Sequence, residues 1–176
     1  MTSQSHTPAS TVSMGSSNRD VRTPHVRLAP GTQNETCLMQ STFGITRRPP
    51  GELPPPEDGR QVGAIRHQAR EHLSAHGLSG LADQAVLILS ELVTNAIVHS
   101  GGQKVTVALS LRAGFLRIVV RDGIPSFRTP RRPSGDDDES GRGLALVEVI
   151  TSEGDGAWGV MDGGSATWCE LNLAAA

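Results

Sequence analysis

Hydrophobic and polar positions divide the chain into a polar N-terminal part and a regularly patterned remainder. Residues 1–35 are rich in Ser and Thr and hold few apolar side chains, so burial cannot offset the entropy of ordering them, and a disordered tail is predicted. A short apolar alternation over residues 37–45 predicts an edge strand, and the proline-rich residues 49–56 predict an extended linker. Residues 36–57 would therefore lead into a single domain over residues 58–176.

Two helices are predicted at the start of this domain. Apolar residues recur at helical spacing from Val62 to Leu73, and Gly77 would end that helix. A second helix is expected from Asp83, an acceptable N-cap, to about His99. Its apolar residues occupy almost the whole circumference, which is typical of a buried helix.

Hairpins dominate the rest of the domain. Alternating or continuous apolar runs predict four strands, over residues 104–111, 115–120, 157–161 and 167–173. A loop over residues 124–140 separates the second of these strands from a third helix, which is expected to begin at Gly141. Three helices with four or five strands joined by hairpins predict an α+β fold, a two-layer sandwich with helices on one face of a mostly antiparallel sheet.

Composition narrows the class of protein. Lys and Arg number 16 against 18 Asp and Glu, and this balance lacks the basic footprint of a nucleic-acid-binding protein. No uninterrupted apolar run approaches the roughly 20 residues of a membrane span, and residues 1–8 lack the apolar stretch of a secretory signal. A cytoplasmic protein without direct nucleic-acid or membrane contact is therefore expected. Cys37 and Cys169 are too few for a disulfide scaffold and are expected to be reduced thiols packed as small apolar groups.

Polar residues on the second helix are the first candidates for chemistry. Glu91 and Asn95 are four residues apart, so their side chains lie one above the other within a polar arc of about 140°. Burial without partners would be costly for both groups, so they face either water or a ligand.

Two glycine-containing motifs follow. Asp122 comes directly after an apolar strand, and with Gly123 it could accept a hydrogen bond from an exocyclic amine such as that of adenine, or form an ordinary Asp-Gly turn. Gly141-Arg142-Gly143-Leu144 opens the third predicted helix. Free N–H groups there would suit phosphates, although a plain loop-to-helix junction has the same pattern.

The order of these motifs is more specific than any one of them. Glu91-Leu92-Val93-Thr94-Asn95-Ala96, then Asp122-Gly123, then Gly141-Arg142-Gly143-Leu144 resembles the N, G1 and G2 boxes of the GHKL ATPases, which include gyrase and histidine kinases. The stretch SELVTNAIVHSGG resembles most closely the anti-sigma-factor serine kinases of the RsbW type, and in particular the stand-alone ATP-binding regulators of actinobacteria. The resemblance covers about residues 58–173.

This resemblance implies the Bergerat ATP-binding fold, with ATP and Mg²⁺ as cofactors. Asn95 would coordinate Mg²⁺, and Glu91 would be the general base that activates a protein serine hydroxyl or water. Asp122 would bond the adenine amine, with Gly123 letting the base approach and Thr167 assisting Asp122.

The resemblance also assigns the phosphate contacts. Four residues would hold the phosphates through backbone amides, namely Gly141, Arg142, Gly143 and Leu144. Residues 124–140 would form the ATP lid. Two features depart from the family pattern: Ser165 stands where relatives commonly have Lys, and residues 136–139 are four adjacent carboxylates that would repel a triphosphate.

The implied function is an ATP- and Mg²⁺-dependent serine/threonine protein kinase of the anti-sigma-factor type. It would act as a transcriptional switch by binding a sigma factor or an antagonist (anti-anti-sigma) protein. The alternative is a nucleotide-binding regulatory module without significant kinase activity, which Ser165 and the acidic lid favour. Relatives of this type often dimerise through the sheet, which leaves a homodimer open.

Overall fold

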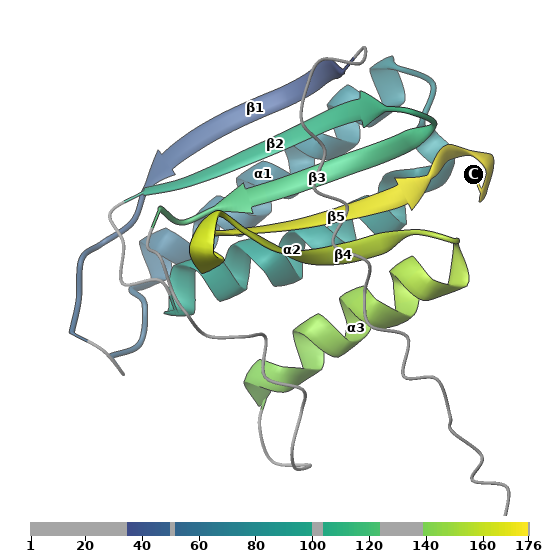
Figure 1. Ribbon diagram of the computed structural model, residues 1–176. Coiled ribbons are helices and arrows are strands. Elements are labelled where there is room, and N and C mark those ends of the chain that lie inside the picture. The colour runs from purple at the N-terminus through teal and green to yellow at the C-terminus, as the bar shows by residue number, and fades with distance from the viewer. Residues whose placement is uncertain (1–34, 50–51, 100–103, 124–138, 176) are drawn as a thin grey trace, which may run out of the picture.

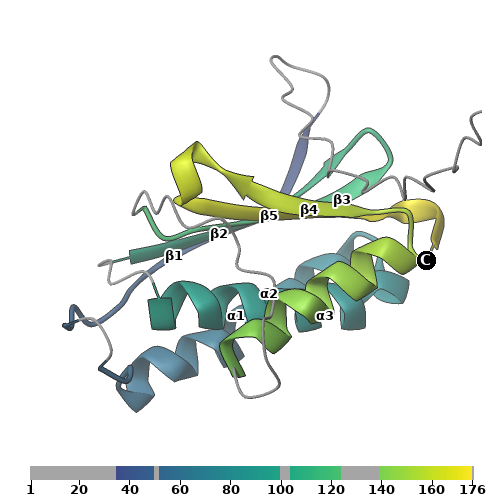
Figure 2. The ribbon, with the colours of Figure 1, turned by 60° about the horizontal axis from the view of Figure 1, so that its bottom comes forward.

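The computed structural model describes residues 35–49, 52–99, 104–123 and 139–175. Within these residues five strands form one antiparallel sheet in the order β1-β2-β3-β5-β4. The strands are β1 (Thr36–Gly44), β2 (Lys104–Arg112), β3 (Phe115–Arg121), β4 (Ala157–Met161) and β5 (Ala166–Asn172). The helices are α1 (Pro56–Ala75), α2 (Ala82–His99) and α3 (Glu139–Glu153), with 3-10 turns at Ser79–Leu81, Asp162–Gly164 and Leu173–Ala175. All three helices lie against the same face of the sheet, which confirms the predicted two-layer α+β sandwich (Figures 1 and 2).

Most element boundaries lie within two residues of the prediction. Helix α1 begins at Pro56, inside the predicted linker, because the fixed φ of proline suits the first turn of a helix. Helix α3 begins at Glu139, two residues before the predicted start at Gly141, so Gly141 lies within its first turn. The predicted disordered tail, apart from Glu35, lies outside the described residues. So does the predicted lid over residues 124–140, apart from Glu139 and Ser140, which begin α3.

Strand β1 occupies one edge of the sheet, as predicted, and pairs with β2 in a register that sets Phe43 opposite Val105. Leu38, Met39 and Ile45 are buried in the same core as the rest of the domain. The register shifts between Cys37 and Met39, which interrupts the alternation of the strand.

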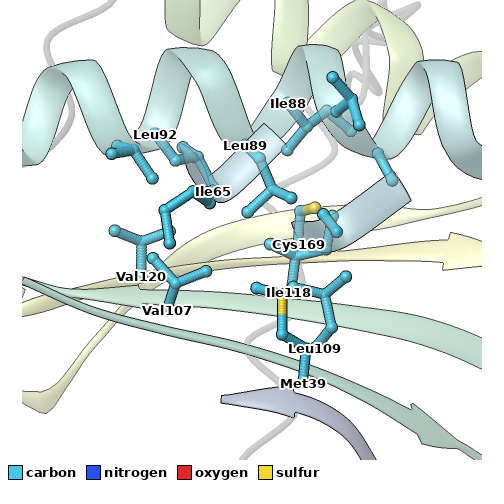
Figure 3. Close-up of a cluster of buried hydrophobic side chains, with 14 of the residues drawn as sticks. Met39, Ile65, Ile88, Leu89, Leu92, Val107, Leu109, Ile118, Val120 and Cys169 are labelled. Carbon is cyan, nitrogen blue, oxygen red and sulfur yellow. The ribbon is translucent and has the colours of Figure 1, made fainter. Parts of the chain in front are cut away.

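Helix α2 is the middle helix of its layer and contacts α1 on one side and α3 on the other (Figure 2). Its side chains Leu89 and Leu92 lie in one buried cluster with Val107, Ile118 and Cys169 of the sheet (Figure 3). This double burial, against the sheet and against two helices, explains why the helix is apolar almost all round.

Segment Ser79–His99 is long and apolar enough to cross a membrane, with a mean hydropathy of 1.5 over its most apolar window. The sequence analysis looked for an uninterrupted apolar run and did not find this segment, because polar residues interrupt it. Of that window, 56% is buried inside the fold, and a helix at the centre of a protein core meets the same criterion.

The two cysteines differ in environment. Cys169 is buried in the core, as predicted, and burial together with the nearby Glu170 carboxylate raises the pKa of its thiol. The prediction of a packed thiol is wrong for Cys37, which is exposed. The register shift after Cys37 allows Leu38 and Met39 both to face the core, and Cys37 is left outside.

Candidate functional site

The end of β3 and the beginning of β5 lie at the same end of the sheet (Figure 1). Thr106 near the start of β2 pairs with Arg121 at the end of β3, so the residue after β3 lies at the same end of the sheet as the start of β2. The beginning of β5 lies here too, because Ala166 pairs with Arg121. The tertiary fold therefore gathers segments that are far apart in the sequence.

Glu91 of α2 lies against Gly143 of α3. Gly143 is buried, and a Cβ built on it would collide with the Glu91 carboxylate and stand 3.3 Å from its Cδ. Only glycine therefore lets α3 approach α2 this closely without displacing the carboxylate. The predicted general base and the predicted phosphate-binding motif are thus in direct contact.

Asn95 lies one helical turn beyond Glu91. Among the described residues, its Nδ2 is the one buried side-chain polar atom without a hydrogen-bond partner. Such an atom costs about 1–3 kcal/mol when it stays unsatisfied, so the position is energetically suited to a ligand that supplies a hydrogen-bond acceptor.

The donor set around Asn95 fits a magnesium–nucleotide better than a metal held by protein alone. Within the described part of the chain no three His, Cys, Asp or Glu side chains cluster as metal ligands. Mg²⁺ accepts a single amide oxygen from a protein because it keeps several waters and takes other ligands from substrate phosphates. The unpartnered Nδ2 of Asn95 is a hydrogen-bond donor that a nucleotide phosphate oxygen would satisfy, while coordination of Mg²⁺ would fall to the oxygen of the same amide.

Asp122 and Thr167 lie on the same side of the sheet. Thr167 pairs with Val120, whose side chain is buried in the core beneath the helices, and Asp122 continues the alternation two residues beyond Val120. Both residues are partly buried. Gly123 has a φ of 74°, in the left-handed region that glycine adopts readily, so the chain can turn away directly after Asp122.

Ser165 contacts the Asp122-Gly123 segment through its backbone carbonyl. Its carbonyl oxygen accepts hydrogen bonds from the backbone N–H of Asp122 (3.1 Å) and of Gly123 (3.4 Å), while its hydroxyl donates to the carbonyl of Asp162 (2.9 Å). Arg121 forms an ion pair with Asp162 across the same junction. The turn between β4 and β5 therefore fixes the backbone of Asp122 and Gly123 through hydrogen bonds. Ser165 supplies no positive charge, unlike the Lys expected at this position.

The first turn of α3 contains Gly141 and Arg142, whose side-chain surroundings lie outside the description, and Leu144 packs against the core. N–H groups of a first helical turn have no partner within the helix, and the positive end of the helix dipole favours anions there. The contact with Glu91 through Gly143 brings this turn to the same site as α2.

A buried arginine was missed by sequence reasoning. The side chain of Arg48 is 6% exposed and donates hydrogen bonds to the carbonyls of Ile97 and Val98 at the end of α2. The sequence holds no signal for this, because Arg47 beside it has the same side chain and is exposed.

Comparison with known proteins identifies one family. The model described as histidine kinase-like ATPase domain matches residues 55–155, which is more than half of the chain. The matched region contains Glu91, Asn95, Asp122 and Gly143. No curated protein matches the chain.

Proposed function

Because the chain belongs to the histidine kinase-like ATPase domain family of the GHKL superfamily, we propose that it is an ATP- and Mg²⁺-dependent serine/threonine protein kinase that acts as a regulatory switch. Family membership implies ATP binding, with phosphotransfer or ATP hydrolysis as the general activity. The use of Mg²⁺, the serine/threonine specificity, the protein partner and the cytoplasmic location are the proposed part.

The observation that carries the proposal is the buried amide of Asn95 one turn from Glu91, whose carboxylate lies on Gly143. The unpartnered atom of that amide is Nδ2, which would donate a hydrogen bond to a phosphate oxygen of the nucleotide. When bound, Mg–ATP supplies the phosphoryl group and neutralises its developing charge. Asn95 would hold the metal through its amide oxygen, and Glu91 would take the proton from the attacking hydroxyl of a serine or of water.

The remaining residues would orient the nucleotide. Asp122 would accept a hydrogen bond from the adenine amine, and the conformation of Gly123 leaves room for the base. Thr167 lies on the same side of the sheet, where its hydroxyl would assist Asp122. The N–H groups in the first turn of α3, which contains Gly141 and Arg142, would bind the phosphates.

In this proposal nucleotide state controls protein binding. The protein would hold a sigma factor, or a comparable target, in one nucleotide state and release it on phosphorylating or docking an antagonist protein. A homodimer through the sheet would be compatible with this role. The partners can be captured from the native organism with the protein loaded with ATP or with ADP.

Calorimetric titration with ATP and ADP, with and without Mg²⁺, tests the site, and labelled-phosphate transfer to captured antagonist proteins tests the kinase. Glu91→Ala is expected to keep nucleotide binding and lose transfer. Glu153→Ala removes an exposed carboxylate from the far end of α3 and serves as the matched control. Transfer at the wild-type rate by Glu91→Ala would show that the base is a different group.

The second candidate function is a nucleotide-sensing module without significant kinase activity. Ser165 favours this function, because relatives commonly have Lys at this position. The Ser165 side chain bonds locally to Asp162, and only its backbone carbonyl contacts the site. Mg²⁺-dependent ATP binding, combined with neither ADP formation nor phosphate transfer, would establish this function in place of the kinase.

A further inference from the structure

Arg48 ties the connection between β1 and α1 to the C-terminal end of α2. Its Nη2 donates hydrogen bonds to the carbonyls of Ile97 and Val98, the latter at 3.1 Å. Its Nε donates to the carbonyl of Glu52 at 2.9 Å. One side chain therefore joins two segments of the connection to a helix that lies about fifty residues further along the chain.

A carboxylate holds this arginine in place. Asp58 in the first turn of α1 lies 3.8 Å from Arg48, and both side chains are 6% exposed. The same carboxylate accepts hydrogen bonds from the backbone N–H of Thr46, at 3.0 Å, and from the Thr46 hydroxyl, at 3.3 Å. The ion pair is thus buried with several of its hydrogen-bonding groups satisfied, which fixes the guanidinium in one orientation.

The end of α2 needs such a partner. The last four carbonyls of a helix have no intrahelical donor, and they form the negative end of the helix dipole. Arg48 supplies two charge-assisted hydrogen bonds to these carbonyls. Asn95 lies immediately before this last turn, two residues before Ile97, so the bonds restrain the backbone next to the predicted magnesium ligand.

We propose that Arg48 is a positioning residue that holds the last turn of α2, and with it the Asn95 amide, in the geometry required to bind a magnesium–nucleotide. This inference rests on the proposed function, because it assigns Mg²⁺ to Asn95. Arg48 itself touches helix carbonyls and Asp58 and acts on the ion only through Asn95. The guanidinium fork matters because one ammonium group cannot reach both helix carbonyls and Glu52 together.

The test compares four variants by calorimetry with ATP, with and without Mg²⁺, under conditions in which each variant is folded. The measured quantity is the factor by which Mg²⁺ tightens ATP binding. Arg48→Gln is expected to lower this factor about tenfold, the low end of the usual effect of residues that orient metal ligands. Arg48→Lys is expected to restore part of it. Arg47→Gln removes an exposed neighbour, and Leu73→Ala destabilises the core in α1; both should leave the factor unchanged.

Hydrogen exchange of the nucleotide-free protein gives a second readout that does not depend on ATP. Arg48→Gln should speed exchange of the amides of residues 97–99 more than Leu73→Ala does. An unchanged Mg²⁺ factor in both Arg48 variants, in a protein whose wild type binds Mg–ATP, would overturn the inference and leave the proposed function standing. A loss of the factor in Leu73→Ala as large as in Arg48→Gln would also overturn it. A wild type without Mg²⁺-dependent binding would overturn both proposals.

Discussion

Replacing Gly143 by alanine separates the role of the α2–α3 contact in catalysis from its role in stability. The new Cβ would collide with the carboxylate end of Glu91 and approach its Cδ to 3.3 Å, but it would meet no backbone atom among its nearest neighbours. The flexible side chain of Glu91 can therefore move aside, at a cost of about 0.5–1.5 kcal/mol for leaving its preferred rotamer.

The stability change should consequently be small. Replacing a glycine within a helix by alanine is worth about 0.5–1 kcal/mol, which offsets most of the rotamer cost. The net change should stay within about 1 kcal/mol in either direction, or up to about 4 °C in Tm for a chain of this size. Gly63→Ala in α1 is the matched control, because a Cβ there meets nothing within 4 Å and only the helix-propensity gain remains.

Activity should respond far more strongly. A displacement of a reacting group by about 1 Å can cost about 100-fold in rate, so ADP formation by Gly143→Ala should fall between about tenfold and 100-fold. ADP release at saturating Mg–ATP measures the rate, and calorimetry should show ATP affinity close to wild type. Unchanged ADP formation would refute the role of the Glu91 position. Loss of ATP binding would show that the new methyl group meets the phosphates.

Four further predictions concern other parts of the molecule. Asn95→Ala should abolish the Mg²⁺ dependence of ATP binding. In a urea titration the free energy of unfolding of this variant should fall by no more than about 1 kcal/mol, because the substitution removes an unsatisfied buried amide atom. Asp122→Asn should reduce the preference for ATP over GTP about tenfold in competition binding, the value of a hydrogen bond to a charged group; an unchanged preference would remove Asp122 from adenine recognition. Burial raises the pKa of Cys169, so the thiol ionises at lower pH in the unfolded state than in the folded state. The free energy of unfolding should therefore fall as pH rises above about 8.5, with a limiting slope of about 1.4 kcal/mol per pH unit. This slope should be absent in Cys169→Ala. Exposed Cys37 should react with a thiol reagent in the native protein, and equal reactivity of both thiols would contradict the structure.

Periodicity along the chain predicted most of the fold because it reflects which side of each element is buried. The alternation in β2 places Val105, Val107 and Leu109 in the core, and the nearly all-apolar α2 proved to be the central helix. The candidate residues Glu91 and Asn95 could be found in the same way, since two polar groups on one side of a buried helix require a partner. These are local properties, and four-residue spacing is enough to reveal them.

Close approaches between distant segments had no such local signal. The contact of Gly143 with Glu91 depends on how α3 crosses α2, and the glycine motif alone was equally compatible with a plain helix start. The bulge that leaves Cys37 outside depends on the pairing of β1 with β2. In both cases a neighbour far along the chain decides the environment of the residue.

The sequence by itself determined the order and type of the helices and strands and most of their buried faces, because apolar side chains recur with the period of each element. The candidate motif residues came from their order along the chain and its resemblance to the GHKL ATPases. Only the tertiary structure decided that Arg48, and not its exposed neighbour Arg47, joins Asp58 and the carbonyls of Ile97 and Val98. A helix end can be satisfied by any cation that reaches it, and which cation does so depends on where the fold brings the preceding strand.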